Sequence, residues 1–221
     1  MVRKPRVGLI RVLTVEDPVE LGVHGRIIER QYPGLELHSH CIPDQFEGIY
    51  DDRTQRIAEP KIVRLAERLA PEVDAIVITC CADPAVASLR QTLRIPVIGA
   101  GSAVATAARA YTDRICVLGL TGEPPDVIAR ILGSSMVAYL VPSGVRIAPD
   151  LVTAEGRQSV LDTVARAREL GVGAIALACG AMATSGVAPL IAKEYGIPTI
   201  DPVVACGLFA SHALLTMRSG E

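Results

Sequence analysis

The chain has 221 residues, is 50% hydrophobic and carries a formal net charge of −2. Its lysines and arginines form no basic stripe, it has no tryptophan, and only 3% of its residues are aromatic. This composition excludes a nucleic-acid surface built on phosphate contacts and base stacking. No apolar run reaches the length of a transmembrane helix. We therefore expect a small-molecule substrate as the partner, with no nucleic acid and no membrane.

Strands and helices alternate in the first half of the chain. We predict strands at 6–13, 35–42, 73–79 and 95–99, and helices at 18–31, 59–70, 83–93 and 101–110. Asp17-Pro18 and Asp83-Pro84 each combine an N-cap residue with a proline suited to the first helical turn. The alternating residues of Leu35–Ile42 indicate an edge strand. The polar stretch 43–58 indicates a long loop of the kind that covers functional sites.

The same order starts again at Arg114. We predict strands at 114–120, 136–141, 174–178 and 197–200, and helices at 124–132, 154–170, 185–195 and 202–217. Such alternation gives parallel sheets covered on both faces. The predicted fold class is therefore α/β, with two pseudo-symmetric Rossmann-like lobes, each a short parallel sheet flanked by helices. We expect residues 1–100 and 203–221 in an N-terminal lobe, residues 101–202 in the second lobe, and the active site in the cleft between them.

Two cysteines stand at the ends of buried strands, Cys80 in the first half and Cys179 in the second. Two thiols across a cleft suit a racemase, because one thiolate removes a proton from carbon and the other thiol returns one on the opposite face. Helices starting at Asp83-Pro84 and at Thr184-Ser185 would stabilise a thiolate. The alternative is that a buried cysteine is a small core residue. We interpret three other cysteines in that way: Cys41, Cys116 and Cys206.

The cysteines also bear on compartment and metal binding. The apolar run near the N-terminus ends at Arg11 and is not a signal peptide, so we expect a cytoplasmic protein with reduced thiols. Cys80 and Cys81 are adjacent and do not suit one tetrahedral zinc site, so we expect no metal. No lysine ends a strand, and Gly99-Ala100-Gly101 is too weak a signal for a dinucleotide loop. We therefore expect no cofactor.

Residues near the strand ends are candidates for substrate binding. Arg11 either pairs with a substrate carboxylate or is a surface arginine, and Thr14 and Thr121 either hold substrate oxygens or cap loops. Tyr50 either covers the site or lies on the surface, and Thr79 either points into the cleft or ends its strand. The catalytic candidates are Cys80, preferred to Cys81 because it follows its strand directly, and Cys179. The substrate-binding candidates are Arg11, Thr14, Tyr50, Thr79, Cys81, Thr121, Gly122, Gly180 and Ala181.

Three segments resemble a known family. Residues 80–86 (Cys-Cys-Ala-Asp-Pro-Ala-Val) resemble the Cys-Phe-x-Asp-Pro-Gly-Leu signature of hydantoin and allantoin racemases, and Leu177–Met182 resembles their Gly-Cys-Ala-Gly-Met signature. Phe46–Asp51 resembles a segment that precedes their second helix. Over nearly its whole length the chain resembles the Asp/Glu/hydantoin racemase superfamily, and hydantoin and allantoin racemases most closely. The resemblance implies that Cys80 and Cys179 are the acid/base pair, that no cofactor is needed and that the two lobes are pseudo-symmetric.

The chain also departs from that pattern. Arg11-Val12-Leu13-Thr14 stands where hydantoin racemases carry Asn-Pro-Asn-Thr, and the motifs that follow the two cysteines of glutamate racemases are absent. We predict a cofactor-independent racemase of a hydantoin-like or amino-acid-derived substrate, acting as a homo-oligomer. The alternatives are an aspartate- or glutamate-type racemase, a maleate-type cis–trans isomerase, and a non-catalytic small-molecule-binding module. A decarboxylase fits less well, because such enzymes keep only one of the two cysteines.

Overall fold

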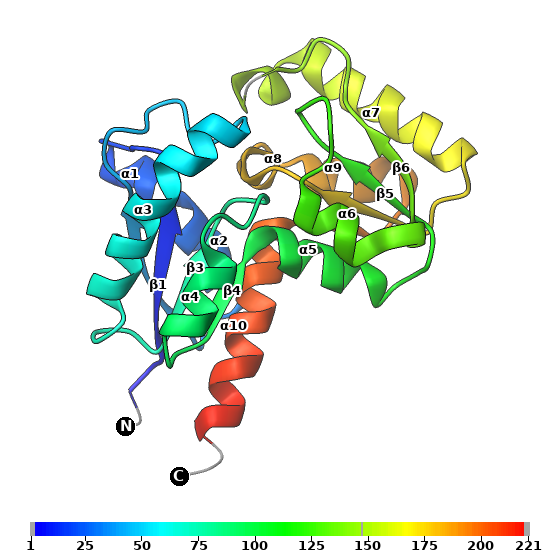
Figure 1. Cartoon of the computed structure of the whole chain (residues 1–221). Helices are drawn as coiled ribbons and strands as arrows, with labels where there is room; N and C mark the ends of the chain where they lie inside the picture. Colours follow the sequence, from blue (N-terminus) through cyan, green and yellow to red (C-terminus); the bar gives the residue numbers. More distant parts are fainter. Residues whose placement is uncertain (1–2, 147, 219–221) are drawn as a thin grey trace. The chain divides into compact units, whose positions relative to one another are not determined.

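The computed structural model describes residues 3–146 and 148–218 (Figure 1). Contacts divide the chain into two compact units, one with residues up to Ala100 together with those from Cys206 onward, and the other with Gly101–Ala205. Each unit contains a four-stranded sheet whose paired strands are parallel. The lobe boundaries predicted from the sequence remain a prediction about domains, since the division describes contacts and not independent folding.

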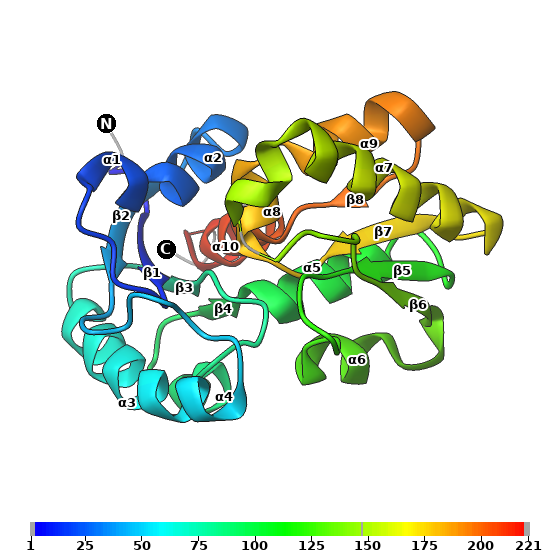
Figure 2. The same ribbon diagram turned by 90° about the horizontal axis from the view of Figure 1, so that it is seen from above.

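The first unit consists, in chain order, of β1 (Arg6–Arg11), α1 (Pro18–Leu21), α2 (Val23–Gln31), β2 (Glu36–Cys41), α3 (Asp52–Leu69), β3 (Ala75–Ile78), α4 (Val86–Thr92), β4 (Val97–Gly99) and the later part of α10 (Pro202–Arg218). The strand order is β2-β1-β3-β4. In Figure 2, α3 and α4 lie on one side of this sheet and α1 and α2 on the other. Ile10 and Ile76 of the strands pack with Ile62 of α3 and Leu89 of α4 in one buried core.

The second unit repeats this plan. It consists of most of α5 (Ala100–Arg109), β5 (Ile115–Leu118), α6 (Asp126–Leu132), the 3₁₀ helix η1 (Gly133–Ser135), β6 (Met136–Leu140), the 3₁₀ helix η2 (Ala148–Val152), α7 (Ala154–Glu169), β7 (Ala174–Leu177), α8 (Gly180–Thr184), α9 (Val187–Tyr195) and β8 (Thr199–Ile200), followed by the start of α10. The strand order β6-β5-β7-β8 matches that of the first unit. Ile175 and Leu177 of β7 pack with Val164 of α7 and Ile191 of α9.

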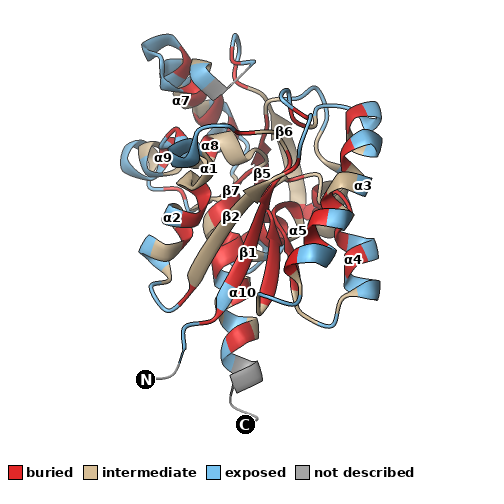
Figure 3. Ribbon diagram, turned by 90° about the vertical axis from the view of Figure 1, so that its left-hand side faces the viewer, coloured by how far each residue is buried: buried red, intermediate tan, exposed pale blue. Residues whose placement is uncertain are grey.

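Burial follows the sequence pattern of each strand (Figure 3). The apolar β3 is buried along its whole length, whereas every residue of the alternating β2 is only partly buried. β2 lies at the edge of its sheet, as its alternation predicts. The predicted fold class is confirmed: the protein is α/β, with two parallel four-stranded sheets flanked by helices.

The predicted loop 43–58 is too long, because α3 begins at Asp52 and not at Glu59. Asp51 caps this helix by accepting a hydrogen bond from the backbone N–H of Thr54 at 2.7 Å. Pro60 lies inside the helix and not at its start. Buried residues at helical spacing on both sides of the proline, Ala58 and Ile62 among them, hold the helix together against the core.

Both helix starts predicted after Cys80 and Cys179 are wrong. α4 begins at Val86, because Asp83 and Ala85 take left-handed conformations with φ of 51° and 61°. The Asp83 carboxylate lies instead over Gly99, where any side chain would overlap it, so it does not cap α4. In the second unit, α8 begins at once after Cys179, and Gly186, with φ of 74°, separates it from α9.

Candidate active site

The two cysteines occupy equivalent positions in the two units. β3 ends at Ile78 and Cys80 is the second residue beyond it, while β7 ends at Leu177 and Cys179 is the second residue beyond it. β3 and β7 are also the same strand in the shared order, next to the central β1 and β5. Each cysteine therefore lies at the carboxyl edge of its own sheet, where ligands bind in open α/β folds.

The residue before each cysteine is the last one held by the sheet. The backbone N–H of Thr79 donates to Ile10 O at 3.1 Å, and that of Ala178 donates to Leu118 O at 2.8 Å. The Thr79 hydroxyl donates to the same Ile10 carbonyl at 3.3 Å, and the side chain is buried. Thr79 thus fastens the end of its strand, which is one of the two roles expected for it.

Burial separates Cys80 from its neighbour Cys81. Cys81 is only 4% exposed, whereas Cys80 is partly exposed and touches the core on one side. The chain turns directly afterwards, with the Asp83 N–H donating to Cys80 O at 3.0 Å. Both the offset from the strand and the exposure favour Cys80 as the thiol that meets a substrate.

Cys179 is the N-cap residue of α8, and Gly180 and Ala181 form the first turn of that helix. Burial raises the pKa of the Cys179 thiol, and the backbone N–H groups of Ala181 and Met182, which face the sulfur, lower it by less. The net pKa lies above the ordinary thiol value, so burial outweighs the helix start and Cys179 carries its proton at neutral pH.

Arg11 ends β1 and is not a surface arginine. Its side chain is 8% exposed, and Nη1 donates to Glu20 O in α1 at 2.8 Å. Burial lowers the pKa of Arg11, and the charge of Glu20 opposes that shift. Nε is buried and has no hydrogen-bond partner among the described residues. The guanidinium is therefore anchored to α1, and pairing with a substrate carboxylate stays a prediction.

The hydroxyl of Thr14 is fully used within the first unit. It donates to Ile42 O at 2.8 Å and accepts from the backbone N–H of Gln45 at 2.8 Å. This fastens the loop after β1 to the loop after β2, the loop-capping role expected as its alternative.

Tyr50 is 55% exposed and its hydroxyl donates to Glu47 at 3.3 Å, so it lies on the surface of this unit. The negative charge of Glu47 raises the pKa of Tyr50.

Thr121 and Gly122 follow β5 and are exposed. The Thr121 hydroxyl donates to Glu123 O at 2.9 Å, and the Tyr139 hydroxyl from β6 donates to Thr121 O at 2.7 Å. The sequence analysis missed Tyr139. The signal is a glycine directly after β5, Gly119, two residues beyond Val117, the strand partner of Tyr139, because only glycine leaves room for the ring.

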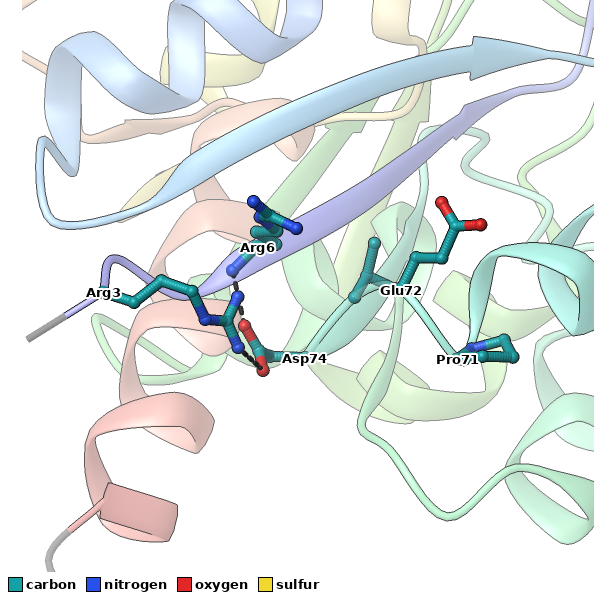
Figure 4. A pocket seen from close by; sticks show the side chains of 6 residues that line it. Arg3, Arg6, Pro71, Glu72 and Asp74 are labelled. Atoms are coloured by element: carbon teal, nitrogen blue, oxygen red, sulfur yellow. Dashed lines mark hydrogen bonds and ion pairs between the residues drawn. The ribbon is translucent and has the colours of Figure 1, made fainter.

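A surface hollow of about 410 Å³ lies at the opposite edge of the first sheet, where the strands begin (Figure 4). The Asp74 carboxylate binds Arg3 at 2.9 Å and the backbone N–H of Arg6 at 2.6 Å there, which ties the N-terminal segment to the start of β3.

Within the described ranges, no group of three or more His, Cys, Asp or Glu side chains is placed to hold a metal ion. Nor is any helix of the described chain long and apolar enough to cross a membrane.

Solved structures with the same fold include several racemases. Allantoin racemase from Klebsiella pneumoniae matches with a TM-score of 0.79 at 22% identity, over 96% of this chain and 88% of that chain. Allantoin racemase from Pseudomonas fluorescens gives 0.72 at 17%, over 96% and 91%. A glutamate racemase from Bacillus anthracis gives 0.70 at 19%, over 97% and 84%. A search of curated proteins gives no match.

At such identities structural similarity shows the fold alone, but the family can be read from the sequence itself. The profile of the Asp/Glu/Hydantoin racemase family matches residues 18–206, which is most of the chain. That span includes Cys80, Cys179 and the strands from β2 to β8. The chain belongs to the Asp/Glu/Hydantoin racemase family.

Proposed function

We propose that this protein is a cofactor-independent racemase that uses Cys80 and Cys179 as its acid/base pair on a hydantoin-like or amino-acid-derived substrate. The observation that carries the proposal is the equal offset of the two thiols from equivalent strands, β3 and β7. Neither binding alone nor core packing requires two thiols at matching strand ends. In the proposed arrangement the two cysteines act on opposite faces of one carbon.

The proposed reaction moves protons only. One cysteine, as thiolate, takes the proton from the carbon next to a carbonyl, and the electron pair of the broken C–H bond moves into that carbonyl to form an enolate. The other cysteine, as thiol, gives its proton to the opposite face, and a new C–H bond forms. Nothing is oxidised or reduced, and the two sulfurs have exchanged protonation states.

The pKa of Cys179 suggests which cysteine starts as the acid and which as the base. Because burial raises the pKa of the Cys179 thiol, we assign Cys179 as the resting acid and Cys80 as the resting base. The backbone N–H group of Gly180 directly follows Cys179 and is a donor that we assign to the enolate oxygen. For the other enantiomer the two roles are reversed.

The test is incubation in D₂O with single enantiomers of 5-substituted hydantoins, of allantoin and of free amino acids. The proposal expects solvent deuterium at the stereocentre together with loss of optical activity for at least one member of the panel. Exchange only in free glutamate or aspartate would identify the amino-acid type of racemase instead. If no compound exchanges deuterium faster than in buffer alone, the racemase proposal is wrong.

A further inference from the structure

Arg11 is a buried cation whose hydrogen-bonding groups the protein satisfies only in part. It ends β1, and its side chain is 8% exposed. Nη1 donates to the backbone carbonyl of Glu20 at 2.8 Å, whereas Nε is buried without a hydrogen-bond partner among the described residues, and Nη2 has none there either. A guanidinium keeps its charge at neutral pH, and a buried charge that lacks partners costs folding free energy. A bound anion would offset that cost.

The described part of the chain supplies no counter-ion to Arg11. None of the ion pairs found there includes this residue. Burial lowers the pKa of Arg11 by more than the charge of Glu20 raises it, so Glu20 does not compensate for burial. Cys41 is the strand partner of Arg11 in β2, and its thiol donates to Val15 O at 3.5 Å. Cys41 therefore holds its proton in a hydrogen bond and does not balance the positive charge.

The two unpaired nitrogens of Arg11 form one edge of the guanidinium. Nε and Nη2 each direct an N–H bond to the same side of the plane's edge, a fork that matches the two oxygens of a carboxylate. Nη1 is not part of this edge, so the bond to Glu20 O fixes the group without using the fork. Nη2, unlike Nε, is not sealed from solvent, which gives an anion access to the edge.

The backbone places this arginine beside the first thiol. β1 lies next to β3, where Ile10 pairs with Ile78, and the N–H of Thr79 donates to Ile10 O at 3.1 Å. Arg11 is therefore level with Thr79, and Cys80 is the next residue. Both Arg11 and Cys80 stand at the carboxyl edge of the first sheet, where ligands bind in open α/β folds. An anion on the fork would belong to a ligand of this edge.

We propose that the Nε–Nη2 edge of Arg11 binds a carboxylate of the substrate, so that the substrate is an anionic acid derived from an amino acid and not a neutral hydantoin ring. The inference rests on the proposed function and names the substrate class of the same site. A neutral ring offers only carbonyl oxygens, which do not balance a buried charge. Arg11 acts in binding and specificity, while proton transfer stays with the two thiols.

The test compares acids with their neutral amides. The N-carbamoyl and free forms of alanine, methionine and phenylalanine are each measured beside the corresponding amide. Deuterium exchange gives kcat/KM, and the shift of the urea unfolding midpoint at saturating compound gives binding whether or not exchange occurs. The unchanged protein is expected to prefer the acid of at least one pair by about tenfold or more, the effect of a charge-assisted pair of hydrogen bonds.

Arg11→Gln is expected to abolish that preference. The value for the acid should fall by about tenfold or more, and the value for the amide should change less than about twofold, because the amide lacks the partner of the charge. Arg11→Lys keeps the charge and loses the fork, so its preference should lie between those of the unchanged protein and Arg11→Gln. Arg11→Met fills the same space without a polar group and takes the place of Arg11→Gln if the latter does not fold.

The matched control is Arg26→Gln. Arg26 also anchors α1, with Nη2 donating to Val19 O at 2.5 Å, and its loss is expected to leave acids and amides unchanged. If the unchanged protein prefers no acid to its amide, or if Arg11→Gln weakens acid and amide equally, the inference is wrong, and exchange of any hydantoin leaves the proposed function standing. If an acid binds through Arg11 but no compound exchanges deuterium, the carboxylate site stands and the racemase proposal fails.

Discussion

The two thiols share a backbone position but not an environment. After Cys179 the chain enters α8 at once, and the N–H groups of Ala181 and Met182 face the sulfur. After Cys80 it passes through a turn with two left-handed residues, and α4 begins only at Val86. Sheet topology therefore gives both thiols the same backbone position, while the segments that follow determine the surroundings of each sulfur. In the proposed mechanism, two thiols at equivalent positions can in this way start from different protonation states.

The threonines after the central strands differ in the same manner. Thr14 uses its hydroxyl both as donor and as acceptor to close the loops of the first unit. Thr121 is exposed, and its hydroxyl bonds Glu123 O at 2.9 Å and the Tyr139 hydroxyl at 3.2 Å. The hydroxyl of Thr14 therefore holds the loops of the first unit together, whereas that of Thr121 lies on an exposed residue of the second unit. Of these two threonines, we expect Thr121 to contribute more to polar recognition of the substrate.

The largest expected effect comes from the thiols. Cys80→Ser and Cys179→Ser should each lower the rate of racemisation by at least about 10³-fold, because a hydroxyl is too weak an acid and base to replace a thiol at neutral pH. Loss of optical activity and deuterium incorporation measure this directly. Cys81→Ser is the matched control and should keep most of the activity. An inactive Cys81→Ser beside an active Cys80→Ser would reverse the assignment of the first thiol.

The next test concerns the turn after Cys80 and the contact that holds it. Gly99→Ala places a methyl group against the Asp83 carboxylate and should lower the free energy of unfolding by about 2 kcal/mol, a typical cost of overpacking. Urea denaturation measures the change. Gly34→Ala is the control, since a Cβ there meets nothing within 4 Å, and it should stay within about 0.5 kcal/mol of the unchanged protein. Equal effects of the two substitutions would show that Asp83 does not hold the turn.

The sequence predicts a feature correctly where neighbouring residues alone determine it. Runs such as Ala75–Ile78 identify buried parallel strands by themselves, and the repeat of such runs predicted both sheets and the offset of both cysteines. Asp83-Pro84 misled because its local signal for a helix start loses to a contact with Gly99, which is distant in sequence. Tyr139 was missed for the same reason, since its role depends on Gly119 and Thr121 in another segment.

The protonation of Cys179 gives a smaller but direct test of the resting roles. Because the pKa of this thiol is raised, its alkylation by iodoacetamide should be at least about threefold slower at pH 7 than that of a free peptide thiol, and should still increase above pH 9. Mass spectrometry of the modified peptide follows the rate. Ala181→Pro removes one N–H that faces the sulfur and should move the pH profile further upward. A profile that levels off near neutral pH would assign the resting thiolate to Cys179 instead.

The smallest expected effect concerns the carboxylates at the end of the fourth strand of each sheet. Asp83 reaches Gly99 from a distant turn, whereas Asp201 follows β8 directly and accepts N–H bonds from Val203 at 2.8 Å and Val204 at 3.1 Å. Burial raises the pKa of Asp201, and those two bonds lower it by less. The protonated carboxyl group therefore favours folding: its contribution is complete below the unfolded pKa of about 3.9 and is lost as the pH rises through the folded value.

Asp201→Asn removes this titration and keeps an acceptor for the two N–H groups. Relative to the unchanged protein, the variant should gain in free energy of unfolding as the pH rises from 4 to 7, whereas Asp201→Ala should lose about 1 kcal/mol at neutral pH because the helix start loses its cap. Urea denaturation at a series of pH values measures both. If the asparagine variant instead loses stability relative to the unchanged protein over that range, the charged carboxylate stabilises the start of α10, and the N–H bonds outweigh burial at Asp201.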